Sequence, residues 1–115
     1  MKSPITTHVL DTANGNPAKG VPVTLSIRDG DGEWKELTRG VTNDDGRITD
    51  WLPEGERAQV GVYKATFRVG SYYKSYGDKP FYSEIPVIFH LHDPASHYHV
   101  PLLLSPYGYT TYRGS

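Results

Sequence analysis

Five histidines are the side chains of this chain best suited to transfer protons near neutral pH. Imidazole has an unperturbed pKa of about 6.5, so it can act as a general acid or a general base under these conditions. Four of the five form two His-x-His pairs, whose side chains share one face if the segment is a β-strand. The chain contains no cysteine, which excludes a thiolate nucleophile or ligand. The histidines are His8, His90, His92, His97 and His99.

The two His-x-His pairs could also bind zinc or copper, because imidazole is a common ligand of both metals. A metal site would need a further ligand, and Asp93 is the one nearby candidate. Such spacing is a weak signal on its own. We therefore expect His90 and His92 to lie at an ordinary solvated strand end, with no metal bound, while the metal alternative stays open.

Residues 98–105 alternate in a way that indicates which side of a strand carries His99. The four positions with the heavier apolar load, which we expect to face a core, are Tyr98, Val100, Leu102 and Leu104. His99 then points outward with Pro101 and Leu103. The same alternation around residue 8 places His8 outward with Leu10. An outer sheet face with apolar side chains is typical of an interface.

Arg47 follows the turn sequence Asn43-Asp-Asp-Gly46 and opens the short strand expected at residues 47–51. Its planar guanidinium could hold a carbonyl or an anion through two parallel hydrogen bonds. It could also be a surface side chain paired with Asp44 or Asp45, a contact that contributes little stability. The sequence contains no P-loop, G-x-S-x-G or H-E-x-x-H motif and no evident pair of catalytic carboxylates.

Short strands separated by turn signals must position these side chains. Residues 21–28 alternate between apolar and polar types, and Asp29-Gly-Asp-Gly32 follows as a hairpin turn. We expect one helix of about two turns at residues 71–76, ended by Gly77. The expected strands span residues 5–11, 21–28, 34–42, 47–51, 60–69, 84–91, 98–105 and 107–113. This pattern predicts an all-β, two-sheet β-sandwich of seven to eight strands with one short helix, in a single domain over residues 1–115.

Composition narrows the classes of function. The 115 residues carry a net charge of −1, and no Lys/Arg cluster interleaves with aromatic residues, so we expect no nucleic-acid partner. No apolar run approaches the roughly 20 residues of a membrane helix, so we expect no membrane partner. Residues 1–7 lack the apolar region of a signal peptide. We expect a soluble protein of the cytoplasm, or of the periplasm if a signal peptide has been removed.

Three segments and a closing motif carry a resemblance to a known family. They read Thr7-His-Val-Leu-Asp-Thr-Ala-Asn-Gly-Asn-Pro-Ala-Lys-Gly20, Thr42-Asn-Asp-Asp-Gly-Arg47, His97-Tyr-His-Val-Pro-Leu-Leu-Leu-Ser-Pro106 and Tyr112-Arg-Gly-Ser115. Together they resemble the 5-hydroxyisourate hydrolases, the transthyretin-related proteins of urate catabolism. The closing motif is the most specific part, because it separates these enzymes from transthyretin, the hormone carrier with the same fold. The resemblance covers essentially the whole chain.

The resemblance implies a transthyretin-like (prealbumin-like) sandwich of eight strands, assembled as a homotetramer that is a dimer of dimers. It implies that a channel between the dimers holds the active sites. The implied reaction is hydrolysis of a cyclic amide bond of 5-hydroxyisourate, which yields 2-oxo-4-hydroxy-4-carboxy-5-ureidoimidazoline without a cofactor. The implied catalytic residues are His8, Arg47, His99 and Ser115, and the implied substrate-binding residues are His8, Arg47, Tyr112, Arg113 and Gly114.

The implied roles agree with the chemistry of these side chains. Two histidines can supply the base and the acid, and Arg47 can hold substrate carbonyls and offset negative charge. Tyr112 can stack on the ring or hydrogen-bond to it, and Ser115 can position water or substrate. His97 matches no essential family position and is interpreted as a residue behind the site.

Two other functions stay open from the sequence. The first is a transthyretin-like protein that binds a small aromatic ligand without turnover. The second is a structural or adhesive sandwich module, since one fold hosts many functions. A structural module would need no convergent histidines and arginine and would be a monomer.

Overall fold

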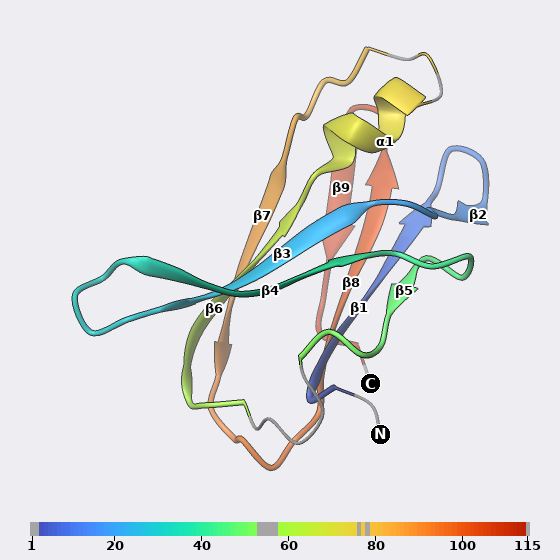
Figure 1. Ribbon diagram of the computed structural model, residues 1–115. Helices are drawn as coiled ribbons and strands as arrows, with labels where there is room; N and C mark the ends of the chain where they lie inside the picture. Colours follow the sequence, from blue (N-terminus) through green and yellow to red (C-terminus); the bar gives the residue numbers. More distant parts are fainter. Residues whose placement is uncertain (1–2, 53–57, 76, 78, 115) are drawn as a thin grey trace.

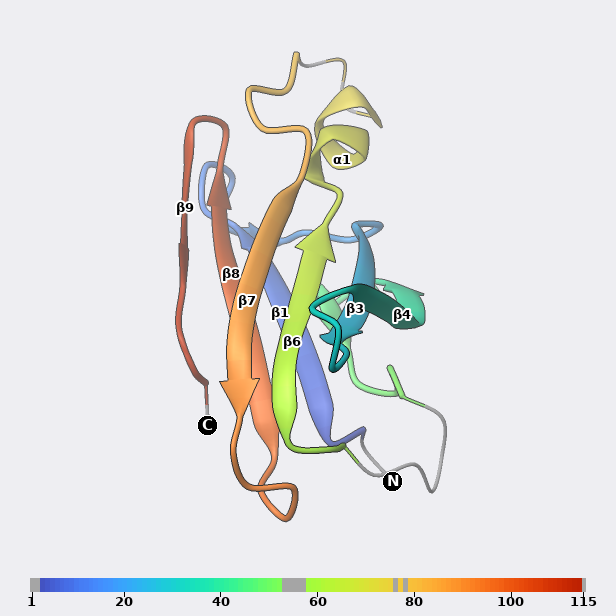
Figure 2. The same cartoon turned by 90° about the vertical axis from the view of Figure 1, so that its left-hand side faces the viewer.

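Two β-sheets packed face to face form the protein, with one short helix at one end, in a computed structural model that describes residues 3–52, 58–75, 77 and 79–114 (Figures 1 and 2). The first sheet contains β1 (Ile5–Asp11), β2 (Asn16–Pro17), β5 (Arg47–Ile48), β8 (Tyr98–Ser105) and β9 (Gly108–Thr111). The second contains β3 (Pro22–Arg28), β4 (Trp34–Val41), β6 (Gly61–Phe67) and β7 (Ile85–Leu91). The helix α1 spans Val69–Ser75. The expected all-β two-sheet sandwich with one short helix is confirmed.

The strand order is β2-β1-β8-β9 in the first sheet, with β5 also paired to β1, and β4-β3-β6-β7 in the second. The strands at residues 5–11 and 98–105 have the expected bounds. The structure adds the two-residue strand β2, which is too short to leave an alternating pattern in the sequence. Strand β5 ends at Ile48 instead of residue 51, and α1 begins at Val69, two residues earlier than expected. Tyr76, the expected last residue of the helix, lies outside the described residues.

Alternating side chains from both sheets fill the core. Val69, where α1 begins, is fully buried and joins this core. Burying one large apolar side chain contributes roughly 1.5–3 kcal/mol, so the two inner faces hold the sheets together. The fully buried side chains from the facing sheets include Val9, Leu102 and Leu104 on one side and Val23, Leu25, Ala65 and Phe67 on the other.

Strands β1 and β8 are parallel neighbours in the middle of the first sheet, and Figure 1 shows them side by side behind β3 and β4. Their register runs from Ile5 opposite Tyr98 to Asp11 opposite Leu104. Partners in register project on the same face, and alternate residues of each strand share that face. The core-facing positions of both strands are buried, so the histidines of these strands lie on the outer face, as expected.

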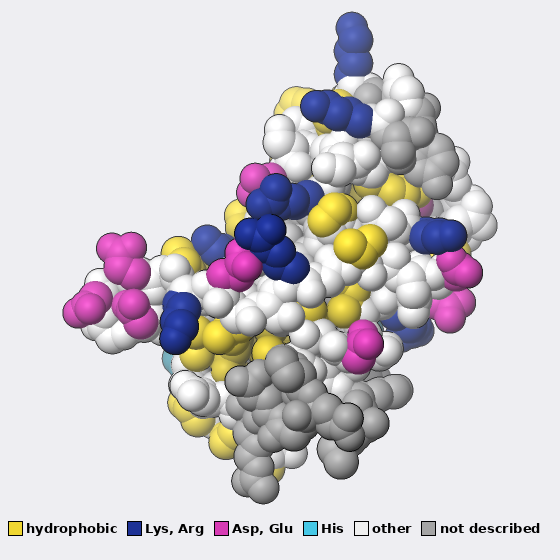
Figure 3. Space-filling view, in the orientation of Figure 1, with side chains coloured by type: hydrophobic (Ala, Val, Ile, Leu, Met, Phe, Trp, Pro, Cys, Tyr) yellow, Lys and Arg dark blue, Asp and Glu magenta, His cyan; other side chains and the backbone are white. Residues whose placement is uncertain are grey.

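The opposite surface has a different character. Figure 3, viewed from the side of β3 and β4, shows lysine and arginine over the middle and acidic side chains at the tip of the β3–β4 hairpin, with histidine almost hidden. The side chains suited to proton transfer therefore gather on other surfaces. Among the described residues, the one helix has seven residues and is too short to cross a bilayer.

The turn between β4 and β5 depends on Gly46. Its φ is +72°, in the left-handed region that residues with a Cβ adopt only at a cost. A Cβ on Gly46 would also lie 2.4 Å from the carbonyl oxygen of Val9. The Gly46 carbonyl accepts a hydrogen bond from the Val9 amide at 2.7 Å, so this turn is attached directly to β1.

We expect Gly46→Ala to destabilise the protein by more than the roughly 1–2 kcal/mol of left-handed strain, because the added methyl also collides with backbone. The matched control is Gly15→Ala, with the same φ of +72° and open space around the added methyl. Chemical denaturation of both variants measures the difference. Equal losses of unfolding free energy in Gly46→Ala and Gly15→Ala would contradict a cost of the clash with Val9.

Candidate functional site

The outer face of the first sheet carries the candidate side chains on two adjacent rows. In one row His8 lies between Arg47 on β5 and Pro101 on β8. In the next row His99 lies between Thr6 on β1 and Gly114, which follows β9. Because His8 and Thr6 are two residues apart on one strand, both rows project on the same side. The structure therefore brings together His8, Arg47, His99 and Gly114.

The backbone of Arg47 is fixed by Asn43. The Arg47 amide donates to the Asn43 side-chain oxygen at 3.0 Å, and the Asn43 amide donates to the Arg47 carbonyl at the same distance. The salt bridges among the described residues are Lys19–Asp44 and Arg39–Glu36, so Asp44 pairs with Lys19 instead of Arg47. Among the described residues Arg47 forms a salt bridge with neither Asp44 nor Asp45, the two partners considered from the sequence.

His8 lies in an environment that favours its neutral form. Burial lowers the pKa of His8 below the usual 6.5, and the positive charge of Arg47 lowers it further. A hydrogen bond with the Asp45 backbone and the Asp45 carboxylate oppose this shift. A histidine that stays neutral near pH 7 can accept a proton, which is the property that a general base needs.

His99 is held on both flanks of its ring. Its Nδ1 lies 2.8 Å from the Thr6 hydroxyl oxygen. On the other flank a Cβ added to Gly114 would lie 2.6 Å from the His99 Cδ2, so any larger residue would require the ring or the segment to shift. The Gly114 amide also donates to the His99 carbonyl at 2.8 Å. With Nδ1 and Cδ2 both flanked, the Cε1–Nε2 edge of the ring points away from the sheet.

The rings of His8 and His99 have centroids 6.5 Å apart and planes inclined by 29°. This separation is too large for direct ring contact. It leaves space for a water molecule or a substrate atom between two groups that can exchange protons. Two histidines and one guanidinium on one face can perform acid–base chemistry on a substrate that develops negative charge.

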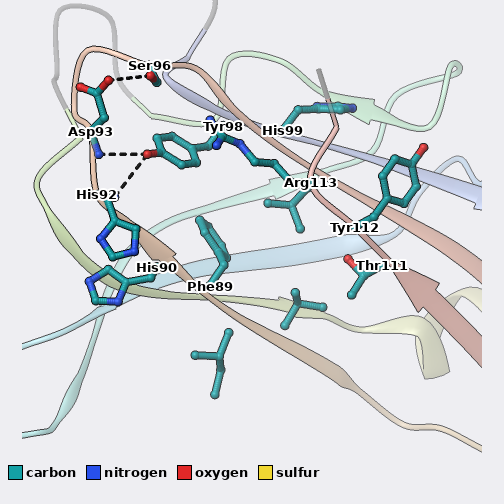
Figure 4. Close-up of a pocket in the computed structure, with 13 residues that line it drawn as sticks. Phe89, His90, His92, Asp93, Ser96, Tyr98, His99, Thr111, Tyr112 and Arg113 are labelled. Atoms are coloured by element: carbon teal, nitrogen blue, oxygen red, sulfur yellow. Dashed lines mark hydrogen bonds between the residues drawn. The ribbon is translucent and has the colours of Figure 1, made fainter.

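The segment after β9 also forms one wall of a cavity of about 560 Å³, whose opposite wall is β7 (Figure 4). The Arg113 guanidinium lies 4.4 Å from the centre of the Tyr98 ring and 3.5 Å from the His97 carbonyl oxygen. The Tyr98 hydroxyl in turn accepts hydrogen bonds from the amides of His92 and Asp93. Arg113 thus fastens the C-terminal segment beside His99.

A further expected site residue, Tyr112, is not part of the two rows. Tyr112 is 55% exposed on the C-terminal segment, and it lines the cavity with His99, whereas His8 and Arg47 do not. One chain therefore does not enclose Tyr112 and the His8–Arg47 pair in a single cavity. Ser115 lies outside the described residues.

His90 and His92 lie apart from the two rows, at the end of β7. Their rings stack with centroids 4.0 Å apart, and both residues are exposed, as expected for a solvated strand end. Within residues 3–52, 58–75, 77 and 79–114, no group of three or more His, Asp or Glu side chains is arranged to hold a metal ion. The absence of a metal stays a prediction.

Thr6 is the site residue that the sequence interpretation missed. Its hydroxyl contacts both His99 and His97, whose Nε2 lies 3.0 Å away. Thr6 precedes His8 by two residues, so the alternation of β1 could have placed it on the outer face. The partner of its hydroxyl could not be inferred, because the pairing of β1 with β8 is not visible in either segment alone.

The chain matches a known protein family over almost its whole length. The family model described as "HIUase/Transthyretin family" matches residues 5–114. The 5-hydroxyisourate hydrolase 2 of Rhizobium meliloti is 49% identical, over 96% of this chain and 95% of that protein.

Solved structures of a 5-hydroxyisourate hydrolase and of a transthyretin have the same fold. The 5-hydroxyisourate hydrolase of Klebsiella pneumoniae superposes with a TM-score of 0.83 at 34% identity, over 96% of this chain and 97% of that chain. Transthyretin from Sparus aurata superposes with a TM-score of 0.90, also at 34% identity, over 96% of each chain. The backbone alone therefore does not distinguish a 5-hydroxyisourate hydrolase from a transthyretin.

We expect Arg47→Gln to raise the pKa of His8, because the substitution removes a nearby positive charge. Burial, the largest cause of the lowered pKa, is unchanged by this substitution, as are the opposing contributions of Asp45. NMR titration of the His8 ring protons measures this shift. Arg113→Gln is the control. It removes an arginine in contact with Tyr98, and it should leave the pKa of His8 unchanged. An unaltered His8 titration in Arg47→Gln would contradict the coupling.

Proposed function

Because the chain belongs to the HIUase/transthyretin family, we propose that it hydrolyses 5-hydroxyisourate on the face that carries His8, Arg47 and His99. Curated relatives named 5-hydroxyisourate hydrolase are 45–49% identical over nearly the whole chain, including those of Rhizobium meliloti and mouse. The chain is a 5-hydroxyisourate hydrolase of urate catabolism. The convergence on one sheet face of two histidines and an arginine that forms no salt bridge with another described residue is the observation that carries the assignment of the site.

Hydrolysis of a cyclic amide has three requirements. A water molecule must lose a proton as it attacks the carbonyl carbon. The developing oxyanion must be stabilised, and the ring nitrogen must gain a proton as the carbon–nitrogen bond breaks. The product is 2-oxo-4-hydroxy-4-carboxy-5-ureidoimidazoline.

His8 is the base in this proposal. Its lowered pKa keeps it neutral, so it can take the proton of the attacking water. Arg47, in register beside it, lies where a guanidinium can hold substrate carbonyl groups and the oxyanion. The same positive charge discourages protonation of His8, so both residues favour the reactive state.

His99 is the acid that delivers a proton to the leaving nitrogen. Thr6 and Gly114 hold its ring so that the distal edge faces outward. Tyr112 binds the flat ring of the substrate, and Gly114 lets the chain pass over His99. Arg113 serves binding by fastening this segment, and Ser115 positions water or substrate.

We extend the proposal to a homotetramer built as a dimer of dimers. Strands β7 and β9 are edges of their sheets, with exposed apolar side chains on or near them. Those side chains include Phe81 at 64%, Ile88 at 59% and Tyr107 at 76% exposure. On the outer face of the first sheet, Leu10 and Leu103 are half-buried and Pro101 is buried within the chain. This face therefore exposes less apolar surface than expected.

The remaining expectations stay predictions. Residues 1–115 are proposed to form one hydrolase domain with 5-hydroxyisourate as its small-molecule partner and without a cofactor. Neither nucleic acid nor membrane is a proposed partner. The location in the cytoplasm, or in the periplasm after removal of a signal peptide, is likewise a prediction.

The hydrolysis is tested by adding the protein to freshly formed urate oxidase product and following the decay of the 5-hydroxyisourate absorbance. We expect His8→Ala and His99→Ala each to lower kcat by about 10²–10⁴-fold, the usual contribution of a general acid or base. Arg47→Lys should lose most turnover although the charge remains, because lysine lacks the planar fork.

The controls for this series are His90→Ala and His92→Ala, which alter exposed histidines away from the two rows and should be nearly neutral. The double variant of His8 and His99 should lose much less than the product of the single losses, because the residues act as a unit. Similar losses in all four single variants, or inactivation by a chelator, would favour a metal site instead.

The close contact between Gly114 and His99 generates a further prediction. Gly114→Ala places a methyl 2.6 Å from the His99 Cδ2, so either the ring or the segment must shift. We expect kcat to fall by about tenfold or more while light scattering still gives the mass of a tetramer. Gly108→Ala is the control, because its added methyl meets only Ser105 at an ordinary 3.5 Å. A monomeric mass of the unaltered protein would refute the assembly, and full activity of Gly114→Ala would refute the role of the contact.

A further inference from the structure

The hydroxyl of Thr6 lies between His97 and His99, the two histidines of one His-x-His pair. Its Oγ1 is 2.8 Å from Nδ1 of His99 and 3.0 Å from Nε2 of His97. Thr6 is only 3% exposed, whereas His97 is exposed. The buried hydroxyl therefore connects a half-buried histidine of the site to a histidine in contact with solvent.

We propose that Thr6 and His97 are positioning residues that set which nitrogen of His99 carries the proton, and that they supply a proton to its Nδ1 as its Nε2 gives one up during turnover. The inference rests on the proposed function, in which His99 is the acid. The interactions that support it involve side chains of the chain alone and can be examined without substrate.

The number of protons on Thr6, His97 and His99 limits which hydrogen bonds these three side chains can form together. A threonine hydroxyl has one proton, so it can donate to only one of the two histidines. If the Thr6 hydroxyl donates to Nδ1 of His99, then Nε2 of His97 donates to Thr6. His99 in that state carries its proton on the outward Nε2, as an acid requires. If the hydroxyl donates to His97 instead, Nδ1 of His99 donates to Thr6 and the outward nitrogen is a base.

The protonation state of His97 selects between these arrangements. A protonated His97 is a donor at both nitrogens, so Thr6 accepts from it and donates to His99. This favours the acid form of His99. A neutral His97 with an unprotonated Nε2 accepts from Thr6 and favours the opposite form. The exposed histidine thereby controls the buried one through a single hydroxyl.

The same chain of groups moves one proton without a net change on Thr6. His99 gives its Nε2 proton to the leaving nitrogen as the carbon–nitrogen bond breaks. Nδ1 of His99 takes the Thr6 hydroxyl proton, and Thr6 takes the Nε2 proton of His97. His97 ends neutral, and His99 ends protonated on Nδ1 alone. The cycle closes when the outward Nε2 of His99 takes a proton from water and the Nδ1 proton returns through Thr6 to Nε2 of His97.

Other charged groups surround the pair. His8 on β1 faces His99 at a centroid distance of 6.5 Å, and Arg47 acts on His8. Arg113 lies 3.5 Å from the His97 carbonyl oxygen and interacts with Asp93. These charges affect both histidines directly, so a test must separate transmission through Thr6 from action through space.

The direct test is ¹⁵N NMR of histidine-labelled protein without substrate. In the unaltered protein, the titration of His97 should be accompanied by opposite shifts of Nδ1 and Nε2 of His99, the signature of tautomer exchange. Thr6→Val keeps the shape of the side chain and removes the hydroxyl, so these opposite shifts should vanish. Parallel shifts of both His99 nitrogens would show simple protonation and overturn the proposal, as would opposite shifts that persist in Thr6→Val.

Kinetics supply the second test. Thr6→Val should lower kcat by about tenfold or more with little change in KM, a part of the roughly 10²–10⁴-fold that an acid contributes. Thr6→Ser should restore most of the loss because the hydroxyl returns. His97→Ala should alter the pH dependence of kcat more than its maximum.

Thr7→Val is the matched control, since it removes the neighbouring hydroxyl, which donates to the Val100 carbonyl at 2.6 Å. It should lower the unfolding free energy without changing the pH profile of the folded enzyme. A Thr6→Val enzyme with an unaltered kcat and pH profile would refute the relay. Absence of hydrolysis by the unaltered protein would refute the proposed function alone.

Discussion

The register of two parallel strands is the constraint on which the candidate site depends. Strand β1 pairs with β8 so that Thr6 lies opposite His99 and His8 lies opposite Pro101. A shift of one strand by one residue would turn its side chains to the other face and bury the histidine of that strand in the core. The apolar residues on the inner faces therefore keep the polar groups on the outer face, because a one-residue shift would expose the apolar side chains.

The same backbone occurs in a transthyretin and in a 5-hydroxyisourate hydrolase. The chain superposes on the first with a TM-score of 0.90 and on the second with a TM-score of 0.83, at the same identity of 34%. The strands supply a rigid frame, and function depends on the side chains at a few positions of it. Here those positions hold two histidines, an arginine without an acidic partner among the described residues, and a glycine that allows the chain to cross a histidine ring.

Sequence patterns predicted most of this frame and part of the site. Alternation gave the bounds of β1 and β8 and the outward direction of His8 and His99, because burial of one face imposes a period of two. Turn chemistry placed Arg47 after the Asn43–Gly46 turn. The contact of Thr6 with His99 could not be predicted, since it joins residues 93 positions apart and depends on a pairing between distant strands. Strand β2 was missed because two residues carry no pattern.

The long span of these contacts has a consequence for how the protein folds. Closing a loop costs more conformational entropy as the loop lengthens, and parallel pairs of distant strands form slowly. The local hairpin of β3 and β4 can form early, whereas the two rows of the site must wait until β8 docks beside β1. During refolding, secondary structure should therefore return before catalytic competence, and activity would report the last steps of assembly of the sheet.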